Sequence, residues 1–266
     1  MSWQWTNRWR LLWPPLVVVV GLLGILQWLT STGVIRDFVI PAPSAVADVL
    51  VTQFDLLLPH LLETTRVSLI GLAVSVLVGV AVALAMDRIG WVYRAFYPLV
   101  VASQTIPILV ITPVIVLLFG YGLTPKILVV VLVCFFPICI SLFGGLRAVD
   151  SDQLRMVHTM GASPWQAMWH VKLPGSLPGL FSGLKISATY CVMAATLAEW
   201  SGGSMGLGIY MLRTKRSYSY DRMFASIVLI IVVSMLFYLA VAGLQRASMP
   251  WRAAERTARQ QHRLKD

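Results

Sequence analysis

Long apolar stretches, separated by short polar segments, recur along the whole chain. A helix rises about 1.5 Å per residue, so about 20 apolar residues cross the hydrocarbon core of a bilayer. Helices also satisfy their own backbone hydrogen bonds, which lipid cannot do. The pattern therefore predicts an all-α integral membrane protein with about six transmembrane helices. The predicted spans are Leu11–Thr30, Val67–Met86, Pro98–Phe119, Pro125–Leu146, Gly179–Trp200 and Phe224–Leu244.

Composition excludes an ordinary soluble domain. The 266 residues are 58% hydrophobic and only 12% charged, whereas an average soluble domain is about 25% charged. The net charge of +10 has two readings, a nucleic-acid partner or basic cytoplasmic loops. Six spans place both termini on one side, and most of the 21 Lys and Arg residues then fall on that side. The positive-inside rule accordingly predicts that both termini are cytoplasmic.

The positive-inside assignment has one clear exception. The predicted outer loop between the last two spans carries four basic residues: Arg213, Lys215, Arg216 and Arg222.

The predicted organisation is a single membrane domain. Residues 1–10 form a cytoplasmic N-terminus, 11–245 the transmembrane domain and 246–266 a basic cytoplasmic tail. The first span lacks a small-residue cleavage site and is expected to remain uncleaved. After it, Pro43 and Ser44 mark a helix start. Apolar residues at helical spacing then predict a helix along the membrane surface; they are Val46, Val49, Leu50, Phe54 and Leu57.

The predicted cytoplasmic loop 147–178 contains strong helix-boundary signals. Asp150, Ser151 and Asp152 supply helix-start chemistry for a short helix through His158, and Gly161 suits the left-handed position that ends it. Ser163 and Gln166 have the spacing of a capping box, with Pro164 at the first helical position. This second helix, about Pro164–Val171, is predicted to stop before Leu173 and Pro174.

The second loop helix is predicted to expose Trp165, Met168 and Trp169 beside the membrane. Exposed aromatic residues with Met are typical anchors for a protein partner. The same residues could instead pack against the chain's own spans or the lipid interface, and both readings stay open on physical grounds alone.

This loop resembles that of bacterial ABC importer permeases. Their pattern is Glu-Ala-Ala, three residues, Gly, nine residues, then Ile-x-Leu-Pro. Gly161 and Leu173-Pro174 match it with the spacing intact, and Val171 stands at the Ile position. Arg155, Met156 and Val157 stand at the Glu-Ala-Ala positions, so that part departs from the pattern. The resemblance implies that Ala162–His170 is the coupling helix, which docks into a cytoplasmic ATPase. The implied coupling residues are Arg155, Gly161, Ala162, Ser163, Pro164, Trp165, Met168, Trp169, Leu173 and Pro174.

Further segments are similar to the nitrate/sulfonate/taurine branch of these permeases. They are residues 40–46, Gln104-Thr105-Ile106-Pro107, residues 119–122, Glu199-Trp200 with Gly202-Gly203, and Gly206-Leu207-Gly208. Within that branch, residues 198–200 and 208–212 look most like permeases for pyrimidine thiamine precursors.

The resemblance implies a type I ABC importer permease in the bacterial inner (plasma) membrane, multi-pass and paired with a second copy as a homodimer. It implies a separate ATPase that holds ATP and Mg²⁺, and an external substrate-binding protein. The substrate would be a pyrimidine thiamine precursor, with a sulfonate, taurine, nitrate and riboflavin as open alternatives.

The chain's own chemistry fits a pathway better than an enzyme. It has no G-x-x-x-x-G-K-[ST] phosphate loop, so no ATP hydrolysis and no cofactor are expected in it. Its His and Cys residues have no metal-site spacing. Polar or adaptable residues within the spans are the pathway candidates, although helix packing would explain them equally well. They are Gln104, Thr105, Pro107, Tyr190, Met193, Thr196 and Glu199.

Two of the pathway candidates carry additional expectations. Pro107 should kink the third span. Glu199, near the outer end of the fifth span, either faces water or lines an outer gate. An ion-gradient-driven secondary transporter remains the alternative function, while a membrane enzyme would need a catalytic cluster that the sequence does not display.

Overall fold

The computed structural model describes residues 3–36 and 39–250, with side chains described from residue 13 onward. Every element in this part of the chain is helical. Five helices are long and apolar enough to cross a bilayer, or six when one bent pair counts as a single span, which confirms the predicted fold class. The elements are α1 (Trp3–Ser31), α2 (Pro43–Thr52), α3 (Phe54–Arg88), α4 (Gly90–Ser103), α5 (Ile108–Phe119), α6 (Leu123–Arg147), α7 (Ser151–Thr159), α8 (Pro164–Ala167), the π-helical turn η1 (Met168–Lys172), α9 (Leu173–Trp200), α10 (Leu207–Arg216) and α11 (Tyr220–Ser248).

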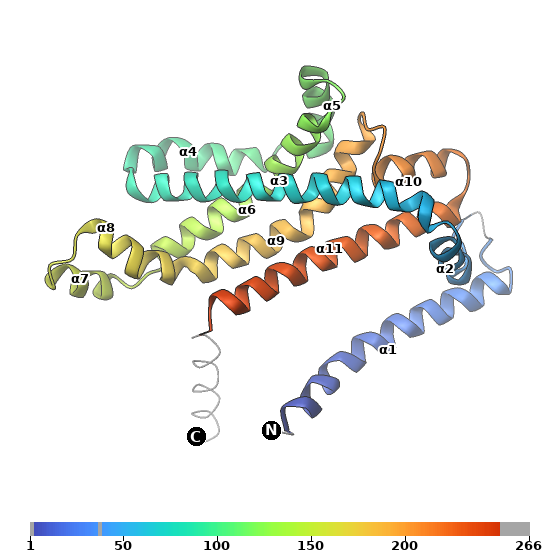
Figure 1. Cartoon of the computed structure of the whole chain (residues 1–266), viewed down its shortest axis with the longest axis horizontal. Coiled ribbons are helices and arrows are strands. Elements are labelled where there is room, and N and C mark those ends of the chain that lie inside the picture. Colours follow the sequence, from blue (N-terminus) through green and yellow to red (C-terminus); the bar gives the residue numbers. More distant parts are fainter. Residues whose placement is uncertain (1–2, 37–38, 251–266) are drawn as a thin grey trace.

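The long helices α3, α6, α9 and α11 run alongside one another and form the body of the molecule (Figure 1). One end carries α7 and α8, and we call it the coupling end. The opposite end carries α2 and α10, and we call it the far end. Helix α1 diverges from the body and approaches it only near α2. Most of the predicted basic tail, residues 251–266, lies outside the described residues.

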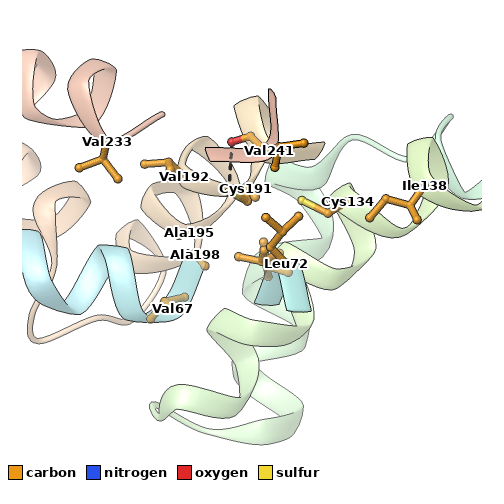
Figure 2. Packing of buried hydrophobic residues seen from close by; sticks show 14 of the residues in the cluster. Val67, Leu72, Cys134, Ile138, Cys191, Val192, Ala195, Ala198, Val233 and Val241 are labelled. Atoms are coloured by element: carbon orange, nitrogen blue, oxygen red, sulfur yellow. Dashed lines mark hydrogen bonds between the residues drawn. The ribbon is translucent and has the colours of Figure 1, made fainter. Parts of the chain in front are cut away.

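The core lies where α3, α6 and α9 meet, with α11 closing one side (Figure 2). Val67 of α3, Cys134 and Ile138 of α6 and Cys191 of α9 are fully buried there. The cysteines are free and buried, and they pack as small apolar residues.

Small residues let α6 and α9 approach each other closely. A Cβ added at Gly183 would collide with the Pro137 carbonyl oxygen and lie 2.8 Å from the Ser141 Cβ. Gly179, one turn earlier, faces the Ser141 carbonyl in the same way. Small residues one turn apart are a common device for close helix contact in membranes. The α6–α9 pair is therefore a tightly fitted unit.

The third predicted span is not one continuous helix. It begins earlier, at Gly90, and breaks between Ser103 and Ile108, where α4 and α5 meet at 104°. Pro107 is the N-cap residue of α5. The expected kink is therefore a complete break. Proline disfavours the helical conformation in the residue before it, so the chain does not continue α4 through Pro107 and begins a separate helix after it.

The predicted surface helix is also divided. Helix α2 ends at Thr52, and Phe54 and Leu57 belong to α3. Val46, Val49 and Leu57 are buried together with Ala225 of α11. The apolar face that suggested membrane contact is thus used within the protein. The Ser44 N–H donates to Gln27 Oε1 across 3.0 Å, which attaches α2 to α1.

The predicted proline stop at Leu173-Pro174 is wrong. The chain stays helical from Pro164 to Trp200. The π-turn η1 provides the explanation, since the Leu173 N–H reaches back to the Met168 carbonyl. A wider turn just before Pro174 accommodates the missing N–H and the ring without ending the helix.

Candidate functional site

At the coupling end, the chain reverses sharply at Gly161. Asp150 caps α7 by accepting from the Asp152 N–H across 2.9 Å. Gly161 has φ +86°, while its N–H donates to the His158 carbonyl and the Ala162 N–H to the Val157 carbonyl. This pair of bonds is a Schellman motif, which favours glycine because other residues are strained at positive φ. The predicted left-handed glycine is confirmed.

The helix that follows Gly161 begins with the predicted capping box. The Gln166 N–H donates to Ser163 Oγ across 3.3 Å, and the Ser163 N–H donates to Gln166 Oε1 across 2.8 Å. Pro164 occupies the first helical position. The two caps fix how Ala162–His170 leaves the bend, so this segment is a preformed feature and not a loose linker.

Two tryptophans project from this segment. Trp165 is 55% exposed and Trp169 is 51% exposed, with their rings edge to face at 5.5 Å. The Arg88 guanidinium lies over the Trp165 ring at 4.8 Å. Met168 was expected to be exposed with them, but it is buried with Met86 and Leu146. The π-turn rotates it toward the core, where its flexible side chain fills space between helices.

An ion pair ties this segment to the end of α3. Lys172 Nζ lies 2.7 Å from Asp87 Oδ1 and, at the same distance, donates to Oδ2. The Asp87 side chain is only 5% exposed, and the Lys172 side chain 23%. A partly buried pair of this kind loses much if one partner is removed, because a charge is left uncompensated. Arg155, by contrast, lies 3.9 Å from Asp152 with both side chains 82% exposed, a weak surface pair.

A cavity of 410 Å³ lies beside the break between α4 and α5. Four of the predicted pathway residues, Gln104, Pro107, Tyr190 and Met193, line it. None of its described lining residues carries a formal charge. The full lining is Ser103, Gln104, Ile106, Pro107, Ile108, Ile111, Leu132, Val133, Pro137, Tyr190 and Met193.

The cavity walls combine apolar surface with a few hydrogen-bonding groups. Tyr190 is 45% exposed and Met193 43% exposed. The Gln104 amide stands at the helix break, where the regular backbone ladder is interrupted. Irregular backbone at membrane depth is tolerated where it lines a cavity. Mainly apolar walls with a few polar groups are typical of small-molecule sites.

The structure does not bring the other three pathway candidates to this cavity. Thr105 is exposed at the break, and Thr196 is buried with Oγ1 bonded to the Met193 carbonyl across 2.8 Å. Glu199 is fully buried at the far end and faces neither water nor the cavity. A pathway role for these three stays a prediction.

Glu199 belongs to a buried network that sequence reasoning missed. Its carboxylate accepts from Thr64 Oγ1 across 2.8 Å and from the Gly208 N–H across 2.7 Å. Thr64 Oγ1 in turn accepts from the Leu207 N–H across 2.8 Å. The two side chains thereby satisfy the first N–H groups of α10, as caps do.

The same network extends to neighbouring polar groups. The Gly206 N–H donates to His60 Nδ1 across 3.1 Å, and Lys126 pairs with Glu63 across 3.0 Å. A Cβ added at Gly206 would collide with the Glu199 carboxylate. The spacing of Gly206 and Gly208 near Glu199 was the available signal, but Thr64 lies 135 residues from Glu199 and no local pattern links them.

Comparisons of the sequence with known proteins identify related membrane transport proteins. The family model described as the binding-protein-dependent transport system inner membrane component matches residues 75–252. The formylaminopyrimidine transport permease protein ThiX of Halalkalibacterium halodurans is 33% identical over 87% of this chain and 93% of its own length. The taurine transport system permease protein TauC of Escherichia coli is 29% identical, with 92% and 93% covered.

Solved structures show the same fold. An inward-facing form of the MetNI methionine ABC transporter superposes with a TM-score of 0.62 at 22% identity, covering 74% of this chain and 97% of that one. An amino acid ABC transporter with histidines gives a TM-score of 0.62 at 17% identity, with 74% and 96% covered. The architecture is thus that of type I ABC importer permeases.

The family match spans well over half of the chain. The chain contains several helices that are long and apolar enough to cross a bilayer, so it is a multi-pass membrane protein. The chain therefore belongs to the family of inner-membrane components of binding-protein-dependent transport systems, and it is the permease subunit of an ABC-type importer.

Proposed function

We propose that two copies of this chain form the pathway of an importer for a small, uncharged heterocyclic solute, with a pyrimidine thiamine precursor as the first candidate. The supporting observation is the cavity at the α4–α5 break, whose described lining holds an aromatic ring, a thioether and an amide but no charge. Moving an anion through an uncharged membrane cavity is costly. Nitrate and sulfonates, which are anions, are therefore second candidates, and so is taurine, a zwitterion whose sulfonate carries the same charge; relatives are named for taurine and for aliphatic sulfonates.

The coupling end is the proposed ATPase contact. Trp165 and Trp169 are exposed anchors on a segment whose direction is fixed by Gly161 and the capping box. ATP and Mg²⁺ would bind the partner ATPase, and the chain itself supplies the docking surface. This end is then cytoplasmic, and both termini lie on the same side. In a closed two-fold arrangement the second copy would contribute the same cavity residues.

The first test is purification of the C-terminally tagged chain from its native host in mild detergent, with mass spectrometry of what accompanies it. The proposal expects a stoichiometric ATPase. A chain that arrives alone, or that moves solute down an ion gradient without ATP, would instead support the secondary transporter, which the comparisons do not favour.

Substrate class is tested on the reconstituted complex. ATP-dependent uptake of radiolabelled formylaminopyrimidine and taurine is compared for the wild type and for Tyr190→Ala. We expect uptake of the pyrimidine, reduced several-fold by the substitution, and no taurine uptake. Ile231→Ala, which shortens an exposed apolar residue of α11 away from the cavity, is the matched control. Uptake of taurine alone would contradict the substrate assignment while leaving the importer intact.

A further inference from the structure

The far end carries a cluster of exposed cations. Arg213, Lys215 and Arg216 lie on the last turn of α10, and Arg222 lies at the start of α11. All four are exposed, and in the described part of the chain none of them forms a salt bridge with an acidic residue. Asp221 is the acidic residue within this turn. We call the four cations and the adjoining Tyr218 the basic patch.

Tyr218 gives the basic patch a strained aromatic centre. It has φ +60°, the one positive φ of a non-glycine residue in the described chain, and its side chain is 78% exposed. The Tyr218 N–H donates to the Lys215 carbonyl and the Ser219 N–H to the Thr214 carbonyl, the pattern in which glycine usually ends a helix. A large residue in this conformation costs stability, and strain of this kind gathers at functional positions.

The patch stands on a rigid base. Glu199 and Thr64 cap the start of α10, and the Arg213 guanidinium donates to the Ser204 carbonyl across 3.1 Å. The start of α10 and the Arg213 side chain are thus held in place before any partner arrives.

The surroundings favour a protein partner over lipid. A helix that lies in a membrane surface needs an exposed apolar face. The large apolar residues of α10 are buried or half-buried against α3, α9 and α11, and its exposed side chains are cationic. Cations in a short outer loop also run against the positive-inside rule. Arg and Tyr together, in contrast, are the residues that dominate protein interfaces.

We propose that the basic patch docks an acidic surface of the external binding protein, with Tyr218 as the central contact and the cations steering approach. The proposal rests on the proposed function, because it takes the far end as the outer face. Complementary charge of this kind raises association rates and weakens with salt, since the screening length is about 10 Å at 0.1 M.

The test uses the permease with its ATPase in nanodiscs, and the binding protein that is identified with the wild-type complex and then produced pure. Lys215→Glu with Arg216→Glu should weaken its Kd at least about tenfold and flatten the salt dependence, while basal ATPase activity is unchanged. Arg66→Glu, an exposed cation of α3 outside the basic patch, is the matched control and should leave the Kd unchanged. An unchanged Kd in the double variant overturns the proposal.

Tyr218→Gly separates docking from folding. Glycine adopts positive φ freely, so the variant should unfold at the same or a higher temperature, yet bind the binding protein several-fold more weakly. Full affinity in this variant overturns the role of Tyr218. If charge reversal changes only the thermal stabilisation of the complex by phosphatidylglycerol, the basic patch is a lipid site and the docking proposal fails.

Failure of the proposed function is distinguishable from failure of docking. In the first case no ATPase accompanies the chain. In the second the ATPase is present and uptake proceeds, but the charge-reversed variant binds the binding protein with the same Kd as the wild type.

Discussion

Gly161 forms the sharp bend between α7 and α8 at the coupling end. Replacing it with Val places a β-branched residue at φ +86°, a conformation that costs an L-residue about 1–2 kcal/mol. We expect Gly161→Val to reduce ATPase co-purification at least about tenfold, with the spans still inserted. Gly161→Asn, which tolerates the left-handed region, should retain most of it. Equal ATPase recovery with Val and the wild type would count against a fixed bend as the basis of docking.

Glu199 allows a second test at the residue scale. Glu199→Ala leaves the Thr64 hydroxyl and the Gly208 N–H without their buried acceptor, at a cost of about 1–3 kcal/mol. Glu199→Gln keeps one acceptor oxygen and should cost less. Thermal unfolding can be followed with a dye that reacts with the buried Cys134 and Cys191. Unaltered unfolding in both variants together with lost transport would instead return Glu199 to the pathway.

At the scale of elements, the fit between α6 and α9 is the most demanding contact. Gly183→Val would drive a branched side chain into the Pro137 carbonyl, and overpacking of this kind costs about 1–3 kcal/mol or more. We expect a lower unfolding temperature and a poorer yield of monodisperse protein in size-exclusion chromatography. Gly144→Val on α6, where an added Cβ meets nothing within 4 Å, is the matched control and should behave nearly as the wild type.

The elements also show why some features could be predicted and others could not. The bend at Gly161 and the capping box of Ser163 and Gln166 depend on residues two to five apart, so both can be predicted from the local sequence. The 104° break before α5 was expected only as a kink, because Pro107 marks a discontinuity without saying how the backbone resumes. The burial of Met168 depends on a π-turn, which the pattern of side chains in the sequence did not predict.

The far end was the least predictable part of the site. Its central carboxylate was visible as one charge in an apolar helix, but its partners come from α3 and from the start of α10. Only the folded arrangement shows that Glu199 holds a loop in place. The basic patch was visible as a departure from the charge rule, and its meaning depended on the geometry of Tyr218.

At the scale of the whole molecule, the proposed orientation makes a direct prediction. The three native cysteines are buried, so introduced cysteines can be labelled with little background. Met160→Cys, at a position 79% exposed near the coupling end, should react with a membrane-impermeant maleimide only from the cytoplasm. Tyr218→Cys, at a position 78% exposed, should react only from outside. Labelling of both from the same side would invert or refute the topology.

One continuous helical stretch from Pro164 to Trp200 connects the coupling end to the far end. Trp165 lies at one end of it, Tyr190 and Met193 lie in its last third, and Glu199 lies next to its other end. A helix of this length measures about 55 Å at about 1.5 Å per residue, so a tilt of about 10° around one end moves the other end by about 10 Å. We therefore expect a displacement of the tryptophans to be transmitted through this helix toward the cavity and the far end, with the π-turn η1 and Pro178 as the points where the helix can bend.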